Sequence, residues 1–154
     1  MKVGWFMRAH YLGHVVFYVR DLQQSLRFYR DLLGFKEVGS IFNGAAAALT
    51  SGRTHHELLL IQVGEAPGPS PGRRRGLYHI GIKVGDSLEE LRAAKKELEA
   101  AGIAIEGMSD HTVSQSLYVQ DPDGNEVEVY VDADEAIWKN NPEAVVAPIK
   151  PLRL

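Results

Sequence analysis

The sequence predicts an α+β fold in which two tandem βαβββ units form a cup-shaped mixed sheet. Two observations carry this prediction. The run LGHVVFYV at 12–19 is echoed by LYHIGIKV at 77–84, and an aspartate follows each run at the same offset. In each copy a helical pattern follows, ends at a glycine and gives way to short strand-like runs. Because one helix covers only one face of its sheet, we expect the other faces to curve around a shared cup.

The helix of each unit is predicted from apolar spacing and from its end signals. Apolar residues at helical intervals predict a helix over 22–33 in the first unit and over 87–101 in the second, and a glycine follows each range. Ser87 with Glu90 three residues later is the pattern of a capping box, which favours a helix start at this point.

The remaining segments complete the predicted organisation. Strands are expected over 35–38, 45–49 and 58–63 in the first unit, and over 103–106, 116–119 and 127–131 in the second. We interpret the chain as a single domain, 1–154, composed of a first unit (12–63), a linker rich in proline and glycine (64–76), a second unit (77–131) and an extended tail (132–154).

Composition narrows the classes of function. The chain has 154 residues, enough for one domain with a core, and a net charge of −3 that offers no electrostatic attraction for nucleic acid or an anionic membrane. It has no cysteine, which excludes disulfides and thiolate chemistry. The N-terminal stretch 1–14 lacks the apolar run of a signal peptide, and no segment is apolar enough to span a membrane. The expected location is cytoplasmic.

Strand alternation selects three side chains for the inside of the cup. In each of three strands the alternate valine, isoleucine and phenylalanine residues face the helix, and this leaves a candidate ligand of each strand on the other side. These residues are His14, His79 and Glu128.

Two histidines and one carboxylate from different strands form the facial pattern that binds Fe(II) or a similar divalent ion. Such a site leaves about three positions open, enough for the two oxygens of a catechol and for dioxygen. Its net positive charge favours a catecholate anion. Fe(II) and Mn(II) share this ligand set, so we expect Fe(II) and keep Mn(II) as an alternative.

With these residues the chain resembles the vicinal oxygen chelate superfamily over residues 12–131. That superfamily includes glyoxalase I, methylmalonyl-CoA epimerase, fosfomycin and bleomycin resistance proteins, and the type I extradiol ring-cleaving dioxygenases. The resemblance implies the fold and the metal chemistry but leaves the reaction open. Single-chain members commonly form homo-oligomers, and we expect the same here by analogy.

A further resemblance is to the catechol 2,3-dioxygenase-like enzymes of aromatic catabolism. Residues 111–128 are similar to the extradiol signature, which runs from a histidine through a tyrosine and an Asp-Pro-x-Gly turn to the ligand glutamate; Ser109 departs from it. The resemblance implies that His56 is the acid–base group, that His111 contacts the substrate and that Tyr118 hydrogen-bonds a substrate oxygen. It also implies cleavage beside the hydroxyls of a small aromatic diol, with both atoms of O2 incorporated.

Two other functions remain open. A glyoxalase- or epimerase-type metalloenzyme on the same fold often draws a fourth, acidic ligand from the last strand of the first unit. Our alignment of the two last strands sets Leu60 opposite Glu128, and Glu57 has the wrong parity to replace it, which counts against this function. A metal-free protein that binds a small molecule such as an antibiotic would need none of the three ligands.

Overall fold

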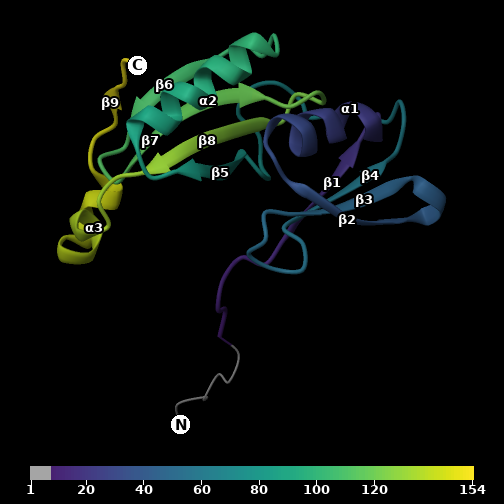
Figure 1. The fold of residues 1–154 in the computed structure, drawn as a ribbon, viewed down its shortest axis with the longest axis horizontal. Coiled ribbons are helices and arrows are strands. Elements are labelled where there is room, and N and C mark those ends of the chain that lie inside the picture. The colour runs from purple at the N-terminus through teal and green to yellow at the C-terminus, as the bar shows by residue number, and fades with distance from the viewer. Residues whose placement is uncertain (1–7) are drawn as a thin grey trace. The chain divides into compact units, whose positions relative to one another are not determined.

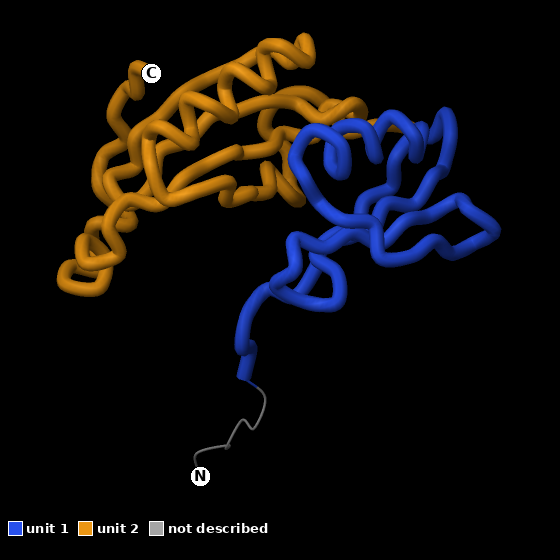
Figure 2. The backbone as a smooth tube through the Cα atoms, in the orientation of Figure 1, with its two compact units in different colours: residues 1–66 blue, residues 67–154 orange. Residues whose placement is uncertain are grey.

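A computed structural model describes residues 8–154, and residues 1–7 of the N-terminal stretch lie outside the described residues. The chain divides between Ala66 and Pro67 into two compact units, shown in blue and orange in Figure 2. This division falls inside the predicted linker, 64–76, which contains no helix or strand. Among residues 8–154, no helix has the length and apolar character needed to cross a membrane.

The first unit is a four-stranded mixed sheet with one helix that changes from α to π along its length. The sheet order is β1-β4-β3-β2, with β1 parallel to β4 and the other neighbours antiparallel. Its elements are β1 (Val15–Val19), α1 (Leu22–Leu26), the π-helical η1 (Arg27–Leu32), β2 (Lys36–Ile41), the 3-10 turn η2 (Phe42–Gly44), β3 (Ala46–Thr50) and β4 (Leu58–Gln62).

The second unit repeats this topology and adds an edge strand. The sheet order is β5-β8-β7-β6-β9, and Figure 1 shows α2 lying across one face of the sheet. Its elements are β5 (His79–Gly85), α2 (Leu88–Ala100), β6 (Gly107–Asp110), β7 (Ser114–Gln120), β8 (Glu126–Asp132), α3 (Ala136–Asn140), the 3-10 helix η3 (Pro142–Val146) and β9 (Lys150–Pro151). The predicted α+β class with two βαβββ units is therefore confirmed.

The predicted helix ends are confirmed by their hydrogen bonds. The Ser87 hydroxyl accepts from the backbone N–H of Glu90 at 3.3 Å, and the Glu90 carboxylate accepts from the Ser87 hydroxyl at 2.8 Å. In the first unit the Asp21 carboxylate caps α1 by accepting from Gln24 N at 2.9 Å. Gly34 follows η1 with a φ of 80°, a left-handed conformation in which glycine carries no side-chain penalty.

Each core lies between the helix and one face of the sheet, as the alternation predicts. In β8 the three valines are fully buried, whereas the residues between them keep partial exposure. In β1 Phe17 and Val19 are buried, and Val16 and Tyr18 are exposed. The fully buried side chains of α2, Leu91 and Leu98, pack in the second core.

Two predicted segments are wrong. The strand expected over 103–106 is β6, which begins only at Gly107, because Ile103 N closes the end of α2 by donating to Leu98 O at 2.9 Å. The tail expected to be extended instead forms α3 and η3 before β9 pairs antiparallel with β6.

Candidate functional site

His79 and Glu128 meet on the helix-free face of the second sheet. The parallel pairing of β5 with β8 sets Gly81 opposite Glu128 and His79 opposite Glu126. Because Gly81 has no side chain, His79 reaches across to Glu128, and His79 Nε2 lies 3.1 Å from Glu128 Oε2. The two side chains are 27% and 16% exposed, so both are partly accessible to solvent. Two of the three predicted metal ligands are thus neighbours.

Glu126 holds the other nitrogen of the same imidazole. His79 Nδ1 lies 3.1 Å from Glu126 Oε1, and both residues stand at one register position of the β5–β8 pair. A carboxylate that accepts the Nδ1 proton fixes the tautomer in which Nε2 has a free lone pair, and this is the form that binds a metal. Glu126 therefore orients His79.

Glu128 is held from β7 by two hydroxyl groups. Ser116, fully buried, donates to Glu128 Oε1 at 2.6 Å, and Tyr118 donates to the same oxygen at 3.3 Å. These bonds leave Oε2, the oxygen beside His79, without a hydroxyl partner among the described residues. Oε1 of Glu128 is therefore held by hydrogen bonds, whereas Oε2 faces His79.

Tyr118 also binds His111, which completes a connected polar group. His111 Nε2 lies 2.6 Å from the Tyr118 hydroxyl and 3.7 Å from Glu128 Oε1. Burial, together with the charge of Glu128, raises the pKa of Tyr118 to about 12. At neutral pH Tyr118 is therefore a neutral phenol that can donate a hydrogen bond.

The loop that presents His111 is held in a constrained conformation. Thr112 has a φ of 72°, which is rare for a β-branched residue. Thr112 N donates to Asp110 Oδ1 at 2.7 Å, and Val113 N donates to His111 O at 2.8 Å. Such local strain persists where the surrounding contacts impose it, and it frequently marks functional loops.

The first unit gathers three histidines. His14 precedes β1 and His56 precedes β4, and the parallel pairing of these strands brings the two imidazole rings to a centroid distance of 4.5 Å. His55 Nδ1 lies 2.6 Å from His56 Nδ1. Burial, and then the neighbouring His55 and His14, lowers the pKa of His56, which favours its neutral form at physiological pH.

The Glu57 carboxylate is hydrogen-bonded within the loop that precedes β4. Its carboxylate accepts hydrogen bonds from Thr50 Oγ1 (2.9 Å), Ser51 N (2.8 Å) and Ser51 Oγ (2.6 Å), and Arg53 Nε lies 3.4 Å away. Burial acts to raise the pKa of Glu57, but the hydrogen bonds from Ser51 and Thr50 outweigh it and lower the pKa below the ordinary value. The carboxylate thereby fixes the turn before His56.

The register corrects our alignment of the two last strands. Val16 pairs with Leu59 as Gly81 pairs with Glu128, so Leu59, and not Leu60, is the counterpart of Glu128. Our parity argument about Glu57 is also wrong, because the same register makes Glu57 the counterpart of Glu126. The first unit still offers no fourth ligand at this position, since leucine has no donor atom.

The predicted site residues thus form two clusters. His14 and His56 lie together in the first unit; His79, His111, Tyr118 and Glu128 lie together in the second. Within residues 8–154, no group of three or more histidine, aspartate or glutamate side chains is arranged to hold a metal. Sequence reasoning missed Ser116 and Glu126; only their placement two residues before Tyr118 and before Glu128, on the same strand faces, could have indicated them.

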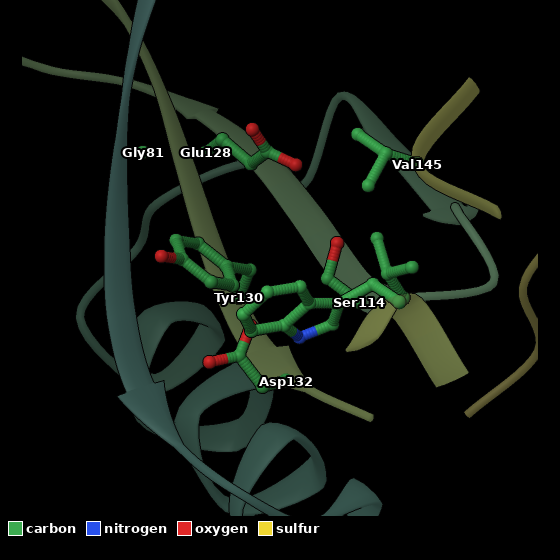
Figure 3. Close-up of a pocket in the computed structure, with 8 residues that line it drawn as sticks. Gly81, Ser114, Glu128, Tyr130, Asp132 and Val145 are labelled. Atoms are coloured by element: carbon green, nitrogen blue, oxygen red, sulfur yellow. The ribbon is translucent and has the colours of Figure 1, made fainter. Parts of the chain in front are cut away.

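A cavity of about 420 Å³ adjoins Glu128 in the second unit (Figure 3). It extends along β8 towards Asp132, and the tail contributes part of its wall. The lining residues are Gly81, Val113, Ser114, Glu128, Tyr130, Asp132, Trp138 and Val145. Its size falls in the range of small-molecule sites.

Residues 11–129 match the model of the Glyoxalase/Bleomycin resistance protein/Dioxygenase superfamily. The chain is 34% identical over 134 residues to the catechol-2,3-dioxygenase of Bacillus subtilis (strain 168), covering 86% of this chain and 45% of that protein. It is 34% identical over 100 residues to biphenyl-2,3-diol 1,2-dioxygenase 2 of Rhodococcus globerulus, covering 62% and 52%. The chain therefore spans about half the length of these curated relatives.

Among solved structures, a glyoxalase/dioxygenase from Nostoc punctiforme superposes with a TM-score of 0.69 at 22% identity, covering 80% of this chain and 91% of that one. At this identity the likeness concerns the fold alone.

Proposed function

Because the chain belongs to the glyoxalase/bleomycin resistance protein/dioxygenase superfamily, we propose that it is an extradiol dioxygenase acting on a catechol-like aromatic diol with O2. One observation carries this proposal: His111, Tyr118 and Glu128 form one hydrogen-bonded group, in the order of the extradiol signature. The resemblance implies that the phenol and imidazole of this group belong to the extradiol signature, which counts against a glyoxalase or epimerase. Relatives named as dioxygenases at 34% identity support the same function.

The spacing of His79 and Glu128 is compatible with two ligands of one divalent metal. Two ligands bonded at about 2.1 Å and at a right angle lie about 3 Å apart, and His79 Nε2 and Glu128 Oε2 are 3.1 Å apart. We propose that these two residues and His14 hold Fe(II), or Mn(II), with neutral imidazoles and one carboxylate. When bound, such a metal supplies open positions for the diol oxygens and O2 together with the redox chemistry of ring opening.

The protein side chains would then orient the diol. The Tyr118 hydroxyl lies within reach of both Glu128 and His111, so it can exchange one of these partners for an oxygen of the substrate. Its raised pKa keeps the phenol protonated, and a neutral donor stabilises negative charge that develops on that oxygen. His111, held by its constrained loop, would donate the neighbouring hydrogen bond.

His56 would accept and return a proton of the diol substrate. A neutral imidazole can accept a proton from the diol and return it later, and the lowered pKa of His56 favours this form. His55 is exposed, and its Nδ1 lies 2.6 Å from that of His56. The proximity of His56 to His14, at 4.5 Å between ring centroids, supports its role beside a metal ligand.

The test is reconstitution of the full chain with Fe(II) without air, followed by addition of air and a panel of catechols that includes biphenyl-2,3-diol. The proposal expects oxygen uptake that matches diol consumption and a yellow ring-opened product. The variant Glu128→Ala should lose both metal and turnover. Tight metal binding without oxygen uptake on any diol would favour the isomerase and epimerase functions; no metal binding would favour a metal-free binding protein.

A further inference from the structure

Gly81 lines the cavity beside Glu128. Gly81 does not have a positive φ, so its backbone does not require glycine. A Cβ atom at this position would lie 3.3 Å from Tyr130 Cε1 and 3.7 Å from Glu128 Oε2. A side chain longer than that of alanine would therefore enter the cavity next to the carboxylate. The space begins at a proposed metal ligand and continues along β8.

The far wall of the cavity comes from the tail. Trp138 of α3 and Val145 of η3 line the cavity, and both keep substantial exposure, at 43% and 58%. The tail is tied to the sheet at both ends, by Ala133 N donating to Val113 O at 2.9 Å and by the pairing of β9 with β6. It lies beyond residue 129, where the family match ends. The two side chains form an apolar wall outside the matched range, and an apolar ligand group would cover it.

The charged side chains that line the cavity are acidic. Its ionisable lining residues are Glu128, Asp132 and Tyr130, with no cation among them. Glu128 and Asp132 are four residues apart on one strand, roughly 13 Å, which exceeds the screening length of about 8 Å, so a cation held at Glu128 would offset little of the Asp132 charge. Lys83 neutralises part of the Asp132 charge, at 2.8 Å, but is shared with Asp86. A substrate carboxylate that reached Asp132 would be repelled by the negative charge of that residue.

We propose that this cavity receives the ring substituent of the diol and selects an uncharged, apolar substituent over a carboxylate-bearing one. The inference rests on the proposed function for the position of the ring: its hydroxyls lie at Glu128, and its substituent points towards Tyr130, Trp138 and Val145. Apolar contact with the tail favours an alkyl or aryl group, and Asp132 disfavours an anionic one.

The test compares two diols that differ at one end, 3-propylcatechol and 3-(2,3-dihydroxyphenyl)propionate. The wild-type enzyme should prefer the propyl compound by about tenfold or more in kcat/KM. Val145→Lys, which places a cation in the cavity, should shift this ratio about tenfold towards the carboxylate. Val146→Lys is the matched control, because Val146 is 82% exposed and does not line the cavity, and it should leave the ratio within about twofold.

A binding measurement separates this inference from the proposed function. In a Trp5→Phe background Trp138 is the only tryptophan, so its fluorescence reports occupancy without turnover. We expect 3-propylcatechol to quench it under nitrogen and Val145→Lys to weaken that binding. If the enzyme turns over catechols but Val145→Lys and Val146→Lys give the same ratio, the inference is wrong and the proposed function stands. If quenching and its loss in Val145→Lys occur without any oxygen uptake, the cavity assignment stands and the dioxygenase proposal fails.

Discussion

Glu126 and His79 are paired through the imidazole nitrogen that faces away from Glu128, with Oε1 3.1 Å from Nδ1. We predict that Glu126→Ala lowers metal affinity by about 10- to 100-fold, because the ring loses the group that fixes its tautomer and orientation. Equilibrium dialysis against a competing chelator measures this change. Glu126→Gln retains an acceptor and should recover part of the affinity, and Glu97→Ala, exposed on α2, should have no effect. Equal affinities in all three variants would contradict an orienting role.

The two adjacent histidines of the first unit should differ in their effect on turnover. His56→Phe should retain the metal but slow kcat by about 100-fold or more, since it removes the group proposed to move the proton. His55→Phe is the matched control: it lies next to His56 and is exposed, and its effect should stay below about tenfold. Stopped-flow turnover with metal content measured in parallel checks both. Full activity in His56→Phe would overturn the acid–base assignment.

Removing the Tyr118 hydroxyl should separate substrate orientation from metal binding. Tyr118→Phe loses the donor to the diol oxygen while Ser116 continues to hold Glu128 Oε1 at 2.6 Å. We expect kcat/KM to fall by about 10²- to 10³-fold, with metal affinity nearly unchanged. The opposite result, loss of metal with normal turnover of the metal-loaded fraction, would mean that Tyr118 only positions the ligand.

Glu57 gives a prediction for stability against pH. Its folded pKa is lowered, so its contribution is present above the ordinary carboxyl pKa of 4.5 and is lost as pH falls through the folded value. Glu57→Gln should therefore destabilise the protein by roughly 1.5–3 kcal/mol at pH 7, because hydrogen bonds to a charged group are lost. Urea unfolding at neutral and acid pH measures this, with Glu97→Gln as control. If the loss of unfolding free energy in Glu57→Gln were as large at acid pH as at neutral pH, the ionised Glu57 carboxylate would not be its cause.

The sequence predicts the sheet faces well because the strand period is short and strict. Val127, Val129 and Val131 alternate with polar residues, and burial of one face leaves only one assignment for Glu128. The same rule applied to the strand with His79 predicted that His79 and Glu128 share a face. Their separation of 3.1 Å, by contrast, depends on the register of two strands far apart in the sequence.

Other features of the site could not be predicted because they depend on the register between neighbouring strands. Ser116 is an ordinary strand serine in sequence, and it becomes a partner of Glu128 only through the pairing of β7 with β8. The alignment of Leu60, instead of Leu59, with Glu128 is a one-residue error in register. The helices α3 and η3 have five residues each, too short for apolar periodicity to indicate them.

The most direct test of the central claim is the fate of the oxygen atoms. The Fe(II)-reconstituted protein would be given an alkyl catechol and isotopically labelled O2, and the product would be analysed by mass spectrometry. The proposal predicts a ring-opened product that contains both labelled atoms, with one O2 consumed per diol. Consumption of the diol without incorporation of label, or metal binding with no reaction on any diol, would contradict an extradiol dioxygenase.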